Sequence, residues 1–155
     1  MKITGSYTLD GPRQDIWPLI HDPISLVSLI PGCEQLAQIS PTEYRGQVQL
    51  RLPAVAGAYT TYVKLIENEA PRYCCFEGMV EGPAGSVSGT ASFKLEPVDT
   101  QTLLEYEGQA MIVGPLARLD SRFAEGIVQT LIKQGLAKLN TQIKMEQHAA
   151  SLPND

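Results

Sequence analysis

The chain has 155 residues, a formal net charge of −5 and a hydrophobic content of 43%. This length suits one domain with a substantial core, and the acidic balance argues against nucleic acid, which requires a basic surface. No apolar run approaches the roughly 18 residues that a membrane-spanning helix needs. The N-terminal stretch contains no apolar signal core, and the three cysteines form no CxxC pair, so a cytoplasmic location is expected.

The beginning of the chain predicts one strand followed by two short helices. Residues 2–9 alternate between apolar and polar side chains, which is typical of a half-buried strand. Pro12 is expected at the first position of one short helix, and Asp22 is expected to cap a second one that begins at Pro23. Trp17 is expected to anchor the first helix on the sheet.

The middle of the chain predicts an antiparallel sheet. Six stretches alternate in the same way and are separated by short turns, which is typical of a meander with one covered face and one wet face. These stretches are 34–40, 44–52, 58–67, 74–81, 86–95 and 102–112.

A long apolar ridge predicts that the last element is a helix from Gly114 to about Gln147, with Pro115 at its first position. The ridge residues are Leu119, Phe123, Ile127, Leu131, Leu139 and Ile143. About 30 helical residues run roughly 45 Å, so this helix is the element long enough to cover the sheet. The expected fold is therefore α+β: a curved, antiparallel, seven-stranded sheet wrapped round a long C-terminal helix, with two short helices after the first strand. The expected domain spans residues 1–147, and residues 148–155 form a polar tail that is expected to be disordered.

The inward face of the predicted sheet carries unusually small side chains. They are Gly46, Gly78, Gly89, Ala91, Gly108 and Ala110, and Gly135 interrupts the apolar ridge of the helix. Such residues either let two backbones approach closely or leave a space. A cavity is favoured, because a long helix cannot sit deep along the whole of a strongly curved sheet.

An apolar ligand is the guest that this cavity would suit. The candidate ligand-binding residues are Tyr44, Val48, Phe76, Gly89, Ala91, Phe93, Tyr106, Gly108, Phe123, Ile127, Leu131 and Gly135. As a set they form an apolar pocket with two phenol hydroxyls, which suits a flat ring bearing carbonyls, such as a quinone head group. The alternative is that each of them is plain core.

No catalytic or metal-binding residue is assigned. His21 and Cys33 lack a third group to orient the histidine, so His21 is interpreted as a surface or loop residue. Glu105 and Glu107 are expected to be solvated on the outer face. Two histidines and scattered cysteines provide no set of three or four metal ligands, and no cofactor is expected.

Several short motifs resemble the CoxG-like family of carbon monoxide dehydrogenase subunits, which is part of the START/SRPBCC helix-grip superfamily. The most specific one is the run Ile30-Pro31-Gly32-Cys33-Glu34, which follows Asp22-Pro23. Others are Gly5-Ser6-Tyr7, the helix opening Pro12 to Trp17, the small-residue strand Gly85 to Leu95, and Gly114-Pro115-Leu116-Ala117-Arg118-Leu119 with Ser121-Arg122. The resemblance covers roughly residues 1–147.

The resemblance implies a non-enzymatic accessory protein that holds a quinone or similar lipid. Its implied partner is a CO dehydrogenase-type molybdenum hydroxylase. Any contact with the membrane is expected to be at most peripheral, at the inner face of the membrane. Two alternatives stay open. The first is a polyketide cyclase or dehydratase that uses the same cavity, with Tyr44 and Tyr106 as its candidate proton-transfer groups. The second is a protein-docking module that uses the outer face of the sheet.

Overall fold

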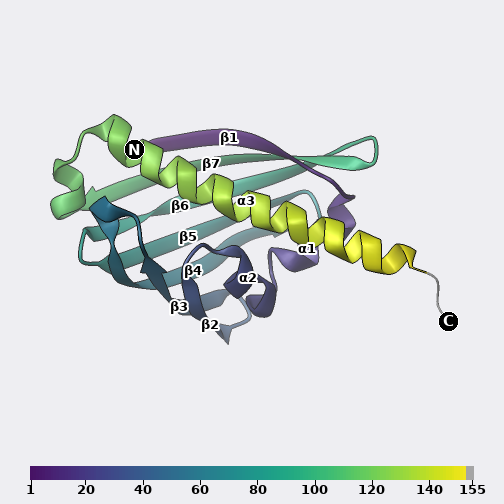
Figure 1. Cartoon of the computed structure of the whole chain (residues 1–155), viewed down its shortest axis with the longest axis horizontal. Coiled ribbons are helices and arrows are strands. Elements are labelled where there is room, and N and C mark those ends of the chain that lie inside the picture. Colours follow the sequence, from purple (N-terminus) through teal and green to yellow (C-terminus); the bar gives the residue numbers. More distant parts are fainter. Residues whose placement is uncertain (153–155) are drawn as a thin grey trace.

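Figure 1 shows the computed structural model, in which one long helix crosses one face of an antiparallel sheet diagonally. The structure describes residues 1–152, with the side chains of Pro23, Ser28 and Leu29 excepted. The strands are β1 (Lys2–Leu9), β2 (Cys33–Ser40), β3 (Glu43–Leu50), β4 (Gly57–Glu69), β5 (Tyr73–Gly82), β6 (Gly85–Val98) and β7 (Gln101–Val113). The helices are α1 (Arg13–Leu19), α2 (Pro23–Leu29) and α3 (Ser121–Ser151), with short 3₁₀ turns η1 (Pro53–Val55) and η2 (Pro115–Arg118). This element order confirms the predicted α+β architecture.

The sheet is a meander whose first strand joins its far edge. The seven strands lie in the order β1-β7-β6-β5-β4-β3-β2, and all neighbours are antiparallel. Tyr106 lies opposite both Gly5 and Phe93, so these three residues point to the same side of the sheet. We call this side, which α3 covers, the inner face. The predicted alternation of inward and outward side chains along the strands is thereby confirmed.

The long helix begins later than its apolar ridge predicted. Pro115 opens the 3₁₀ turn η2, and α3 starts only at Ser121. Leu119 is extended, and the carboxylate of Asp120 accepts a hydrogen bond of 2.8 Å from the backbone N–H of Arg122. An aspartate in this capping position satisfies a backbone donor that would otherwise lack a partner, which sets the start of the helix.

The helix also ends later than predicted. It continues past Gln147 to Ser151, so the start of the predicted disordered tail at residue 148 is wrong. The last part of that tail, residues 153–155, lies outside the described residues.

The two short helices follow their predicted signals with one shift. Asp22 caps α2, where its carboxylate accepts from the backbone N–H of Ile24 at 3.3 Å. Pro12 occupies the capping position of α1 rather than its first turn, because its backbone is extended. Ile16 of α1 is completely buried.

Buried apolar residues form two separate clusters. The first joins α1, β1 and the C-terminal half of α3 to the sheet, and contains Ile3, Leu9, Ile16, Leu19, Leu95, Leu104, Tyr106, Leu136, Leu139 and Ile143. The second lies around η1 and contains Val48, Val55, Tyr59 and Ala84, with Leu116 and Ile127 packed against it. The helix is therefore fixed most firmly at its C-terminal half.

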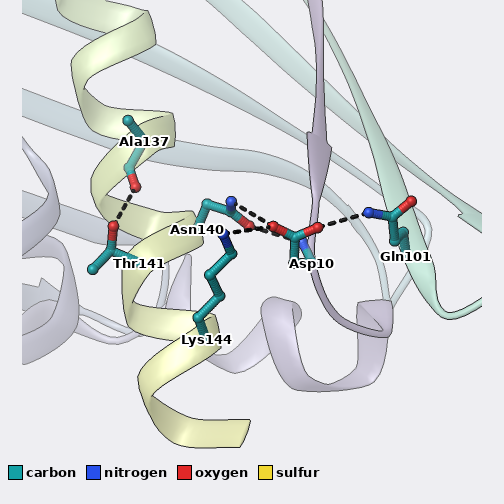
Figure 2. A network of polar contacts seen from close by, with 6 residues as sticks. All are labelled: Asp10, Gln101, Ala137, Asn140, Thr141 and Lys144. Carbon is teal, nitrogen blue, oxygen red and sulfur yellow. Dashed lines mark hydrogen bonds and ion pairs between the residues drawn. The ribbon is translucent and has the colours of Figure 1, made fainter. Parts of the chain in front are cut away.

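A polar network ties the end of β1 to α3 (Figure 2). The carboxylate of Asp10 accepts hydrogen bonds from Gln101 at 2.6 Å and from Asn140 at 2.9 Å, and pairs with Lys144 at 3.2 Å. The side-chain oxygen of Asn140 accepts in return from the backbone N–H of Asp10 at 2.8 Å. The hydrogen bonds from Asn140 and then Gln101 hold the pKa of Asp10 below its ordinary value.

This network predicts a pH-dependent contribution to stability. Because the folded-state pKa of Asp10 is lowered from 3.8, its contribution is present above about pH 4 and is lost as the pH falls through the lowered value. We expect Asp10→Asn to lower the Tm at pH 7, and the difference from the parent protein to shrink near pH 3. Circular dichroism melts at both pH values measure this.

The matched control is Asp99→Asn, in the turn between β6 and β7. Asp99 is exposed and has a φ of 55°, which asparagine tolerates. Its Tm should stay close to that of the parent. An Asp10→Asn deficit of the same size at both pH values would contradict the prediction.

Candidate ligand-binding site

The inner face is only half-buried between the two clusters. Gly78, Ala91, Gly108 and Ala110 point toward α3, yet solvent still reaches them. Leu131 of α3 is half-buried as well. A core packed at ordinary density would bury apolar groups in this position. The middle of the inner face is therefore accessible apolar surface beneath a helix.

The glycines of the inner face are needed for different physical reasons. A Cβ atom at Gly89 would overlap the carbonyl oxygen of Gln109, and one at Gly46 would overlap the carbonyl oxygen of Gln35. These two glycines permit close approach of backbones. A Cβ atom at Gly78 would meet only the carbonyl oxygen of Tyr62, at an ordinary 3.5 Å. Gly78 therefore lies beside free space, whereas Gly46 and Gly89 lie against the backbone of a neighbouring strand.

The two phenols predicted to face a ligand already have partners within the chain. The hydroxyl of Tyr44 donates to the carbonyl oxygen of His21 at 3.0 Å. The hydroxyl of Tyr106 donates to the side-chain oxygen of Gln129 at 2.8 Å, and the amide of Gln129 donates to the carbonyl of Thr4 at 3.2 Å. Burial raises the pKa of both phenols. They fix α3 and the segment after α1 to the sheet.

An aromatic row crosses from α1 to the inner face. The ring of Trp17 stacks on that of His21 with centroids 4.5 Å apart. The ring of His21 lies 6.0 Å from Phe76, and Phe76 meets Phe93 edge-on at 6.1 Å. His21 lies in the loop between α1 and α2, as predicted, but it is not a surface residue, because it is half-buried and its Nε2 is buried. The i, i+4 spacing of Trp17 and His21 was the sequence signal that placed both rings on one side of the chain.

The remaining predicted site residues take mixed positions. Val48 belongs to the second cluster, and Ile127 packs against it. Leu131 and Gly135 are half-buried on α3. Phe123 is 52% exposed and belongs to neither cluster. The residues that surround the accessible inner face are thus Phe76, Ala91, Phe93, Gly108 and Leu131.

Two surface hollows lie outside this part of the inner face. One of about 220 Å³ lies between η1 and η2, lined by Pro53, Ala54, Ala56, Pro83, Ala84, Pro115, Leu116 and Leu119. Another of about 520 Å³ lies mainly on the outer face of β1, β7, β6 and β5, where Glu105, Glu107 and Lys94 make it polar. Neither is lined by Gly78, Ala91 or Gly108.

One of the cysteines, Cys74, is a packing residue of the core. Cys74 is completely buried on the inner face, while Cys75, next to it, faces outward. Burial raises the pKa of the Cys74 thiol to about 12, which disfavours the reactive thiolate. Within residues 1–152, no His, Cys, Asp or Glu side chains gather into a group that could hold a metal ion. None of the described helices is long and apolar enough to cross a membrane.

A seven-stranded antiparallel sheet wrapped round a long C-terminal helix is the helix-grip fold. A START superfamily protein from Mycobacterium smegmatis has the same fold, with a TM-score of 0.74 at 9% identity, covering 93% of this chain and 97% of that one. The chain belongs to the CoxG family of carbon monoxide dehydrogenase subunits, whose model matches residues 5–144.

Other solved structures are similar over nearly their whole length. A conserved protein from Geobacillus kaustophilus is 27% identical with a TM-score of 0.91, covering 94% of this chain and 96% of that one. The protein XoxI from Bacillus cereus is 16% identical with a TM-score of 0.70, covering 95% and 98%. No curated protein matches the sequence.

Proposed function

We propose that this protein is a non-enzymatic accessory protein that carries an apolar molecule, a quinone or a lipid, between the inner face of the sheet and α3. The observation that carries the proposal is the half-buried apolar surface around Ala91, Gly108 and Leu131. A flat ring or an acyl chain placed there would cover that surface and gain the free energy of its burial.

The partner that we propose is a CO dehydrogenase-type molybdenum hydroxylase. Support comes from membership of the CoxG family, whose description names a carbon monoxide dehydrogenase. In this role the chain would present its cargo to the enzyme and perform no bond-making step itself.

The geometry of the phenols favours carriage over catalysis. A polyketide cyclase-like reaction on the inner face would need a group that moves protons near neutral pH. Tyr44 and Tyr106 are the candidates from the sequence, but both hydroxyls are engaged and burial raises both pKa values. Neither phenol is therefore suited to act as a general base.

Mass spectrometry of an organic extract from the natively purified protein tests the proposal. We expect a quinone or lipid in an amount that approaches one molecule per chain, above a matched blank from the same host. The purified protein should also take up such a molecule when it is incubated with membrane lipid. An extract that stays at the blank level, both before and after this incubation, would contradict the carrier function.

A further inference from the structure

His21 occupies a position that the proposed function does not explain. It follows α1, and its ring lies between Trp17 on that helix and Phe76 on the inner face. Phe76 lies opposite Ala91 across β5 and β6, and Ala91 lies opposite Gly108 across β6 and β7. The imidazole therefore borders the accessible apolar surface.

The hydrogen bond at Nδ1 determines what the other ring nitrogen can do. Nδ1 of His21 lies 2.9 Å from the carbonyl oxygen of Trp17. A carbonyl oxygen only accepts hydrogen bonds, so Nδ1 carries the proton and donates it. In the neutral imidazole, Nε2 then has a free lone pair and is a hydrogen-bond acceptor.

Nε2 is buried and has no hydrogen-bond partner in the part of the chain that the structure describes. The other buried side-chain atom in this condition is Nε of Arg13, whose Nη1 donates to the carbonyl of Leu95 at 3.3 Å. The two phenols on the inner face, Tyr44 and Tyr106, already donate to protein acceptors. A buried polar atom normally has a partner, because it otherwise loses its hydration without compensation.

We propose that Nε2 of His21 accepts a hydrogen bond from a hydroxyl group of the carried molecule. The preferred ligand is then a flat apolar ring that bears a hydroxyl, such as a phenol or a hydroquinone. Its ring lies against Phe76 and its hydroxyl points toward α1. This inference rests on the proposed carrier function and adds the residue that recognises the polar end of the ligand by a hydrogen bond.

A pair of probes, one with a hydroxyl donor and one with that hydroxyl methylated, tests this assignment. The probes are 2-naphthol and its methyl ether, 2-methoxynaphthalene, which share the flat apolar ring. Isothermal titration calorimetry at pH 8 measures the affinity of the parent protein for each probe. One neutral hydrogen bond predicts that naphthol binds about threefold to tenfold more tightly than the ether.

Variants of His21 test whether this residue causes the tighter binding of naphthol. His21→Phe keeps an aromatic ring for stacking, and His21→Asn keeps an amide near the position of Nδ1; both remove the acceptor at Nε2. The matched control is His148→Phe, because His148 is the other histidine and is exposed on α3. Circular dichroism shows which variants fold, and His21→Asn alone carries the test if His21→Phe does not.

A naphthol-to-ether affinity ratio that falls to about one in the His21 variants, and persists in His148→Phe, is the expected result. An affinity ratio that stays the same in the His21 variants would overturn the inference, since another group or a trapped water would then accept the hydrogen bond from the hydroxyl. Equal binding of both probes by the parent protein would overturn the inference and leave the carrier function standing. Binding of neither probe by the parent protein would count against the carrier function and remove the basis of the inference with it.

Discussion

Replacing Ala91 with phenylalanine is expected to block ligand uptake while leaving the protein folded. Ala91 is half-buried on the inner face, between Phe76 and Gly108 on the neighbouring strands. If the space beneath α3 holds the ligand, a larger side chain fills that space. We expect the amount of ligand recovered per chain to fall more than tenfold, and the free energy of unfolding to change by less than about 1 kcal/mol.

The matched control for this variant is Thr90→Phe. Thr90 is the preceding residue on β6, and its exposed side chain points to the outer face. Its recovery of ligand should equal that of the parent protein. If Ala91→Phe instead costs about 1–3 kcal/mol of stability, as overpacking of a filled core does, the inner face is close-packed and the carrier function fails.

Truncating Ile143 to alanine is expected to have the largest effect on stability. Ile143 is 1% exposed and belongs to the first cluster, where α3 meets β1 and α1. The loss of buried methyl groups, together with the cavity left behind, predicts about 2–5 kcal/mol of destabilisation. Urea unfolding followed by circular dichroism, with the m-value compared between variants, measures it.

Met145→Ala provides the comparison on the same helix. Met145 is 64% exposed, so its truncation should stay within about 0.5 kcal/mol of the parent protein. Equal losses at Met145 and Ile143 would show that helix propensity, rather than burial against the sheet, determines the effect.

These two predictions concern different parts of the contact between α3 and the sheet. The C-terminal half of α3 carries Leu136, Leu139 and Ile143, which are buried in the first cluster. In the N-terminal half Ala124 is buried, but the larger side chains of Ile127 and Leu131 are only half-buried. A helix that is fixed at one end and packed loosely along the other can cover a guest molecule without losing its attachment. This division would let one element serve both stability and the proposed ligand binding.

The sequence by itself determined the fold to a large extent. Alternating side chains predicted the strands, and short turns predicted the meander, because a period of two and tight turns are local properties of the chain. The cap at Asp22 followed from local chemistry in the same way. The apolar period does not reveal the start of α3, because it continues through η2, and the helix begins only after the cap at Asp120.

Only the tertiary structure decided what the candidate site residues do. Residues far apart in sequence supply the partners of the phenols: Tyr106 with Gln129, and Tyr44 with the carbonyl of His21. Gly89 is needed because a carbonyl oxygen of the neighbouring strand lies where a Cβ atom would be. That contact depends on the register of the two strands. His21 became a candidate for the same reason, since the burial of Nε2 depends on how α1 lies against the inner face. Side-chain periodicity assigns a residue to a face, whereas its hydrogen-bond partner depends on the packing of distant segments.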